Sequence, residues 1–116
     1  MIVRRLEDPE VVSTTYRAHG GGVARMVMDG RLLQAIEFLA YAIIPPGNSL
    51  EEHRDPFEEI YMIHQGGGLM RVGDEEREVK AGDAVWIPVG EIHGLKNTTE
   101  AVMTIYVIAA YPREES

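Results

Sequence analysis

Short apolar runs, separated by glycine and proline, alternate with polar positions along most of the chain. The 12 glycines and 6 prolines fall mainly between these runs. They leave segments of roughly 5 to 10 residues, the spacing that is typical of an all-β sandwich or barrel. The pattern predicts one antiparallel β-barrel with two facing sheets and little helix. We expect strands at residues 23–28, 33–44, 59–64, 68–72, 76–80, 83–87, 92–96 and 101–110.

One of these segments has a competing interpretation. Residues 31–38 contain enough leucine, isoleucine and alanine to form a helix. However, Gly30 precedes the segment, Pro45 and its neighbour follow it, and the β-prone run 36–44 overlaps its end. We therefore predict a single long strand over 33–44.

The N-terminal arm and the last strand predict that two copies of the chain associate. We expect an N-terminal arm at residues 1–22, a barrel at residues 23–111 and a disordered tail at residues 112–116. The arm contains the β-prone run Val11–Tyr16, which could add a strand to a neighbouring chain. The strand at 101–110 is apolar on both faces, so one face is expected to be buried beyond the monomer. These features predict a homodimer, in which the arm could be a swapped strand.

Composition and charge exclude several classes of function. The chain of 116 residues has a net charge of −8 and a pI near 4.9. This charge argues against a nucleic-acid partner and an anionic membrane surface. The absence of cysteine excludes disulfides, thiolate metal sites and a cysteine nucleophile. The N-terminal residues show no signal-peptide pattern and no apolar run is long enough to span a membrane, so we expect a cytoplasmic protein.

Two blocks of the sequence place glycine, histidine and carboxylate residues at fixed spacing. The first block contains Gly47, His53, Glu59 and Gly66, and the second contains Gly82, Pro88, Gly90, His93 and Asn97. The blocks resemble the two motifs of the cupin superfamily, G-x5-H-x-H-x3-E-x6-G and G-x5-P-x-G-x2-H-x3-N. One family position differs, because Asp55 stands where the first motif has its second histidine. The resemblance implies a small single-domain cupin, a double-stranded β-helix or jelly roll, with a metal at its centre.

The residues themselves agree with a metal site. His53 and Asp55 are two positions apart, so on a strand both side chains would face one side. A barrel brings such positions together with Glu59 and with His93, which follows a Pro-x-Gly turn. Two imidazoles and one or two carboxylates suit one divalent transition metal: Fe, Mn, Ni, Zn or Cu. Calcium prefers oxygen ligands alone.

Asp55 has two possible roles. If it is a ligand, the metal is held by His53, Asp55, Glu59 and His93, and two carboxylate charges balance the cation. If it instead caps the turn before Pro56, the other three residues form a 2-His-1-carboxylate triad with open positions. Both roles are compatible with the sequence.

Other polar residues receive secondary roles. Tyr61 shares a strand face with Glu59 and is the candidate catalytic residue, since its hydroxyl could act as an acid or hydrogen-bond donor. Asp55, if it does not bind metal, and Glu37 are further acid–base candidates. His64 is expected on the outer face of its strand, and His19 in a surface loop that three glycines make mobile.

Two functions are compatible with these residues. The first is a metal-dependent enzyme, an oxygenase, isomerase or lyase, that acts on a small organic molecule. The second is a non-catalytic small-molecule-binding or sensor module whose metal is structural or absent. The sequence does not choose between them, because cupins support many functions.

Overall fold

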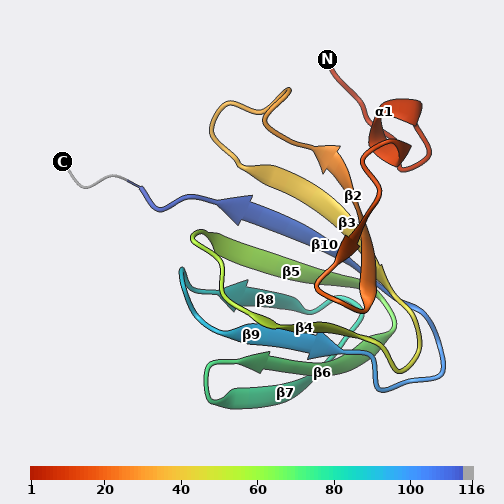
Figure 1. The fold of residues 1–116 in the computed structure, drawn as a ribbon, viewed down its shortest axis with the longest axis vertical. Coiled ribbons are helices and arrows are strands. Elements are labelled where there is room, and N and C mark those ends of the chain that lie inside the picture. Colours follow the sequence, from red (N-terminus) through yellow and green to blue (C-terminus); the bar gives the residue numbers. More distant parts are fainter. Residues whose placement is uncertain (114–116) are drawn as a thin grey trace.

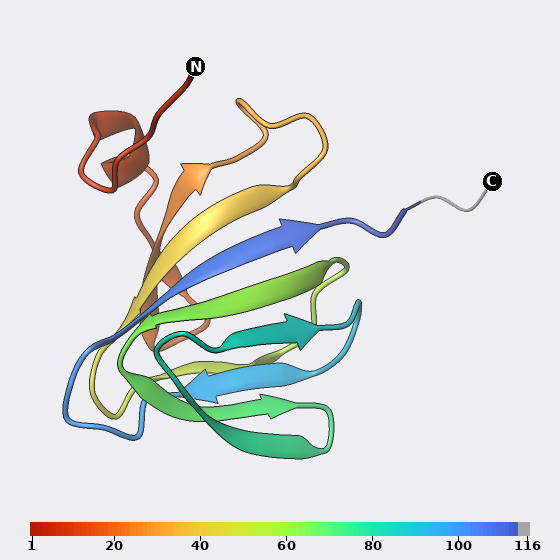
Figure 2. The ribbon, with the colours of Figure 1, turned by 180° about the vertical axis from the view of Figure 1, so that it is seen from behind.

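Two antiparallel sheets make up the fold in the computed structural model, which describes residues 1–113 (Figures 1 and 2). The larger sheet has the order β1-β2-β3-β10-β5-β8 and the smaller one β4-β9-β6-β7. The larger sheet contains β1 (Tyr16–Ala18), β2 (Gly22–Met28), β3 (Phe38–Ile44), β10 (Met103–Ala110), β5 (Glu58–Gln65) and β8 (Ala84–Ile87). The smaller sheet contains β4 (Ser49–His53), β9 (His93–Lys96), β6 (Gly67–Val72) and β7 (Glu75–Lys80).

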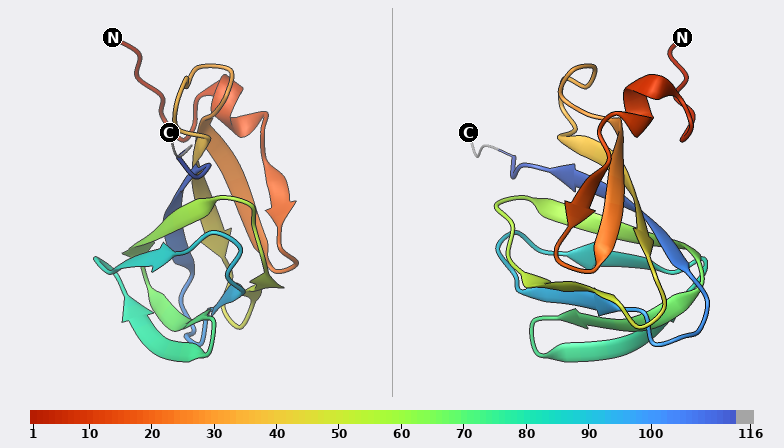
Figure 3. Two further views of the ribbon diagram at one scale, coloured as in Figure 1. Left: turned by 90° about the vertical axis from the view of Figure 1, so that its left-hand side faces the viewer. Right: turned by 45° about the vertical axis from the view of Figure 1, so that its right-hand side comes forward.

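The expected fold class is confirmed. Strands account for 52 % of the structure and helix for 4 %, the helix being α1 (Pro9–Val12). The sheets face each other as the two layers of a jelly roll (Figure 3), and hydrogen bonds do not close them into a continuous barrel. Among the described residues, no helix has the length and hydropathy needed to cross a membrane.

The core lies between the two sheets and follows the alternation of each strand. On β5, Glu59, Tyr61 and Ile63 are buried, whereas Ile60 and Met62 between them are exposed. Their buried partners come from both sheets and include Ile44, Ile87, Leu95, Met103 and Ile105. Each fully buried aliphatic side chain contributes about 1.5–3 kcal/mol of transfer free energy. This packing sets the face of β5 that carries a carboxylate into the lumen.

The long strand predicted at 33–44 is wrong in its first part. β3 begins only at Phe38, which pairs with Ala109 of β10. The Glu37 N–H still donates to the Ala109 carbonyl, but β10 ends at Ala110, so the residues before Glu37 have no ladder to join. They form a loop instead, which starts with a turn in which Leu32 and Leu33 donate to the Asp29 carbonyl.

The N-terminal region also differs from its β-prone pattern. Val11 and Val12 lie in α1, where Pro9 occupies the start of the helix, and Val11 is fully buried. Strand pairing begins at Tyr16, and β1 pairs with β2 of the same chain. The sequence analysis did not delimit β1 or β4, and residues 114–116 of the expected tail lie outside the described residues.

Candidate metal centre

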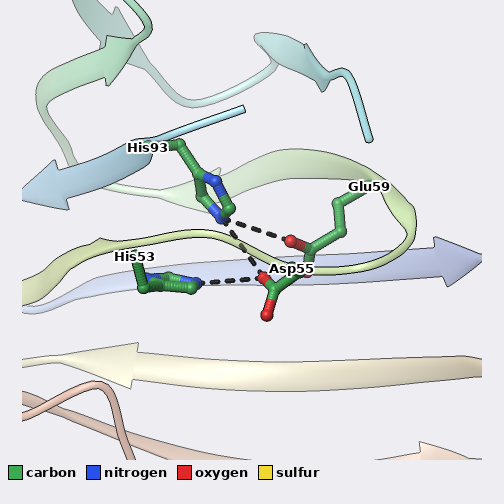
Figure 4. Close-up of side chains that lie close together, drawn as sticks. All are labelled: His53, Asp55, Glu59 and His93. Carbon is green, nitrogen blue, oxygen red and sulfur yellow. Dashed lines mark ion pairs between the residues drawn. The ribbon is translucent and has the colours of Figure 1, made fainter. Parts of the chain in front are cut away.

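Four side chains from different parts of the chain meet in the lumen (Figure 4). His53 ends β4 and His93 begins β9, and the two are register partners in the smaller sheet. Glu59 points toward them from β5 of the larger sheet. Asp55 comes from the loop that connects β4 and β5. The fold thus brings together the residues that the sequence analysis selected.

The distances between their polar atoms are short. Asp55 Oδ2 lies 3.1 Å from His53 Nε2 and 3.5 Å from His93 Nε2, and Glu59 Oε1 lies 3.2 Å from His93 Nε2. One potential ligand atom from each residue lies within 4.8 Å of all the others. His93 and Glu59 are buried, whereas the side chains of His53 and Asp55 keep 15 % and 17 % of their exposure.

Both histidines are oriented by the same backbone contact. The Nδ1 atom of His53 is 2.7 Å from the carbonyl oxygen of Glu51, and that of His93 is 2.9 Å from the carbonyl oxygen of Glu91. A carbonyl only accepts, so each Nδ1 carries the proton and donates it. The Nε2 lone pair of each ring is therefore free to bind a metal in the lumen.

Three atoms in the cluster are buried and have no hydrogen-bond partner: His53 Nε2, Glu59 Oε1 and His93 Nε2. Unpaired buried polar atoms are costly and are rare in folded proteins. A divalent cation between them would satisfy all three at once. The donor set of two imidazole nitrogens and carboxylate oxygens is one that first-row transition metals accept. The residues present therefore fit a metal ion.

The pKa values of Glu59 and His93 also fit a metal site. The pKa of Glu59 is raised to about 7: burial is the largest cause, the contact with His93 opposes it, and the neighbouring Asp55 adds to it. Burial lowers the pKa of His93, but its contacts with Glu59, the Glu91 carbonyl and Asp55 outweigh this, so the net pKa is raised. Without a cation, the cluster thus favours bound protons on groups that a metal would need deprotonated.

Asp55 reaches the cluster from a loop and not, as the sequence predicted, from the same strand face as His53. β4 ends at His53, so Asp55 does not share a strand with it. Instead, the loop turns and docks on the motif turn at Gly90, whose N–H donates to the Asp55 carbonyl over 2.9 Å and whose carbonyl accepts from Arg54. Within residues 1–113, no backbone N–H donates to the Asp55 carboxylate, which faces the imidazoles (Figure 4). This arrangement favours the ligand role over the turn cap.

Tyr61 lies beside the cluster in the lumen. Only 2 % of it is exposed, and its ring meets that of His93 nearly edge-on at a centroid distance of 5.8 Å. Burial, followed by the charges of Glu59 and Asp55, raises the pKa of Tyr61 well above 10. The hydroxyl therefore stays protonated near neutral pH and is available as a hydrogen-bond donor. Glu37, by contrast, is exposed before β3 and does not join the cluster.

The two remaining histidines have different positions. His64 lies on the outer face of β5, as expected, with its Nδ1 3.1 Å from the Thr104 hydroxyl and its ring beside Tyr41 and Tyr106. His19 lies in an exposed turn, as expected, and its ring also stacks on His53 at a centroid distance of 3.4 Å. The sequence analysis missed this contact. The three glycines after His19 were the available signal, because they also permit close backbone approach.

A cavity of about 830 Å³ lies elsewhere, between the free edges of β7 and β8. Its walls include Met70, Val79, Val85 and Trp86 together with charged residues of β7. None of the four clustered residues lines it. The converging ligand atoms therefore lie apart from this cavity.

The fold and the site together define an antiparallel jelly roll that carries a histidine and carboxylate cluster in its lumen. In a comparison with known families, residues 40–109 match the Cupin_2 family, described as cupin domain. The match spans more than half of the chain, and the protein belongs to this family.

Known proteins with similar sequences and structures agree. An uncharacterized protein of Methanocaldococcus jannaschii is 32 % identical over 99 residues, which cover 84 % of this chain and 78 % of that protein. An oxalate-binding protein of Thermotoga maritima is 31 % identical over 101 residues, covering 84 % of both chains. The crystal structure of a predicted oxalate decarboxylase from Thermotoga maritima superposes with a TM-score of 0.76 at 24 % identity, covering 96 % of this chain and all of that chain.

Proposed function

We propose that this cupin binds one divalent transition metal through His53, Asp55, Glu59 and His93 and uses it to bind or transform a small organic molecule. The observation that carries the proposal is the convergence of three buried, unpaired ligand atoms on one point, with the Asp55 carboxylate beside them. Two anionic and two neutral ligands balance the charge of a divalent cation. Four protein ligands also leave positions open on a metal that takes six.

The residues around the metal would select the small molecule. A bound cation would supply Lewis acidity toward an oxygen donor. Tyr61, whose pKa is raised and whose ring meets that of His93 nearly edge-on, would donate a hydrogen bond in the lumen. The side chains packed around the lumen are largely apolar, because Ile63, Ile87 and Val107 belong to the same buried core as Tyr61. We propose a small molecule with an oxygen donor and an apolar body.

The proposal includes two alternative roles for the metal-loaded protein, binding and catalysis. A relative named as an oxalate-binding protein supports a binding role for a cupin of this size. A metal-dependent oxygenase, isomerase or lyase is the alternative and requires turnover as well as binding. Oxalate is a practical first probe, since its two carboxylates can donate to a metal. A cytoplasmic location is a further expectation, based on the cysteine-free sequence.

The test begins with the metal content of the purified protein. Elemental analysis should give about one transition-metal ion per chain, either as isolated or after anaerobic reconstitution with Fe(II), Mn(II), Ni(II) or Zn(II). Oxalate titration and an oxygen-uptake screen of the loaded protein then separate binding from oxygenase chemistry. Failure to retain any of these ions after reconstitution would contradict the proposal.

We also propose that the protein is a homodimer that uses the outer face of the larger sheet. Ile60 of β5 is exposed and lies between Ile108 of β10 and Trp86 of β8, both of which are also exposed. Met62 extends the patch along β5. An apolar row across three strands is typical of an interaction surface. The row itself is uncharged, and the Glu58 carboxylate beside it accepts a hydrogen bond from Trp86 Nε1, so a second copy can pack on the row in two-fold symmetry.

A further inference from the structure

The turn between β1 and β2, residues 19–21, lies beside the site, because the His19 ring stacks on that of His53. It lies against β4, the free edge of the smaller sheet (Figure 3). The Gly21 N–H donates to the Ser49 carbonyl over 2.9 Å, and the His19 carbonyl accepts from the Glu51 N–H over 2.8 Å. A β-bridge between Gly20 and Leu50 lies between these bonds. The turn is thus paired with a strand rather than free, contrary to the mobile loop expected from the glycines.

The glycines allow this close pairing. A Cβ atom on Gly21 would lie 2.7 Å from the backbone nitrogen of Ser49, a separation that real Cβ atoms do not adopt. The turn can therefore sit on β4 only without a side chain at this position. The backbone of His19 is thereby fixed beside Glu51, which lies two residues before the ligand His53.

His19 itself has an unusual backbone conformation. Its φ angle is 44°, and it is the only non-glycine residue among the described ones with a positive φ. Non-glycine residues in this region are strained, and such strain persists where the surrounding structure enforces it. In this conformation the His19 ring lies parallel to that of His53, with an interplanar angle of 8° and a centroid distance of 3.4 Å.

Two contacts from the turn therefore converge on one ligand. The ring of His19 covers a face of the His53 ring, and the Glu51 peptide connects the two residues. The Glu51 N–H donates to the His19 carbonyl, while the Glu51 carbonyl accepts from His53 Nδ1 over 2.7 Å. The stack sets the plane of the imidazole, and the hydrogen bond sets its rotation within that plane.

We propose that His19 is a positioning residue that holds His53 with its Nε2 directed at the metal. This inference rests on the proposed metal function of the cluster. Groups that orient a metal ligand typically change metal affinity by about 10- to 100-fold when removed, because the ligand must then be ordered on binding. His19 would act in this way through its flat ring, from outside the four ligands.

Two substitutions distinguish an effect of the His19 ring on metal affinity from an effect on folding. His19→Gly removes the ring and suits the left-handed backbone, so the metal-free protein should keep or raise its thermal midpoint. Its dissociation constant for Zn(II), measured by chelator competition, should rise by about 10- to 100-fold. Its Co(II) complex should show an altered visible spectrum. His19→Phe restores a flat ring and should recover most of the affinity.

A matched control is His64→Ala, which removes a histidine from the outer face of the sheet and should bind Zn(II) like the wild type. Wild-type affinity and an unchanged Co(II) spectrum in His19→Gly would overturn the positioning role. So would a folded His19→Phe that binds as weakly as His19→Gly. A wild-type protein that binds neither ion would instead refute the proposed metal function itself.

Discussion

At the scale of single residues, the proposed metal centre depends on which atom each side chain directs into the lumen. His53 and His93 donate Nδ1–H to carbonyls two residues earlier, so both present Nε2 to the carboxylates. Glu59 is buried among them with a raised pKa. The three buried atoms lack partners within the described chain. Each of these side chains is therefore expected to make its own contribution to metal binding.

His93→Ala should abolish metal retention. The side chain is fully buried and its Nε2 lies close to both carboxylates, so its loss leaves the cluster without a central ligand. We expect a metal stoichiometry near zero after dialysis, against about one per chain in the wild type. His64→Ala should retain the full stoichiometry. Full occupancy in His93→Ala would show that the metal is bound elsewhere.

Asp55→Asn tests whether the carboxylate is a ligand. The substitution keeps the shape and an oxygen donor but removes one negative charge. If Asp55 binds the metal, affinity should fall by orders of magnitude, which the absence of a backbone cap at its carboxylate favours. A turn cap predicts unchanged affinity and a loss of about 1 kcal/mol in stability.

Asp55→His restores the ligand type that the family motif has at this position. It should bind metal at least as well as the wild type, unless the backbone before Pro56 cannot direct an imidazole inward. Metal stoichiometry and thermal midpoints of the Asn and His variants, measured side by side, distinguish these outcomes.

The raised pKa of Glu59 predicts a pH dependence. In the metal-free protein its pKa is raised from 4.5 to about 7, so the folded state binds a proton that the unfolded state releases across this interval. Its contribution to stability is therefore complete below pH 4.5 and is lost as the pH rises to about 7. The raised pKa of His93 acts in the same direction. Metal affinity should increase over the same interval, because the cation needs the deprotonated groups.

The measurement compares the metal-free wild type with Glu59→Gln, which cannot ionise. As the pH rises, the thermal midpoint of the wild type should fall relative to that of Glu59→Gln. A constant difference over this range would show that Glu59 ionises normally.

At the scale of elements, the loops of the two motifs hold the strands in place. Asn97 follows β9 and is fully buried. Its Nδ2 donates to the carbonyls of Ile44 and Ala101, and its Oδ1 accepts from the backbone N–H and the hydroxyl of Thr99. One side chain thus connects the end of β3 with the loop before β10. This is a structural role for a motif residue outside the metal cluster.

Asn97→Ala should accordingly destabilise the fold. It leaves the buried Ile44 carbonyl without its Asn97 partner, and an unpaired buried group costs about 1–3 kcal/mol. The thermal midpoint of the metal-free protein should fall, whereas that of Asn48→Ala, at an exposed position in a nearby loop, should not. An unchanged midpoint in Asn97→Ala would contradict this role.

At the scale of the whole molecule, the outer face of the larger sheet predicts the oligomeric state. Light scattering at micromolar concentration should give the mass of a dimer. Ile60→Glu places a charge in the exposed row between Ile108 and Trp86 and should yield monomers that still bind metal. Val102→Glu, at an exposed position in the loop before β10, is the control and should remain dimeric. A monomeric wild type would refute the dimer, and a dimeric Ile60→Glu would place the interface elsewhere.

The sequence by itself determined the fold class and four of the site residues. Alternating apolar positions and turn residues fix strand faces locally, so β5 through β9 could be located to within one or two residues of their observed ends. His53, Glu59 and His93 could be selected because their positions match the two motifs. Asp55 could be selected because it stands at a motif position.

Only the tertiary structure decided what depends on partners distant in the chain. Where β3 begins depends on where β10 ends, and the pattern of residues 33–37 carries no information about that. Asp55 reaches the imidazoles through a loop that docks on Gly90, not through strand alternation. His19 meets His53 because the glycine turn pairs with β4, 30 residues further along the chain. Such contacts depend on the packing of whole strands, which local propensity does not specify.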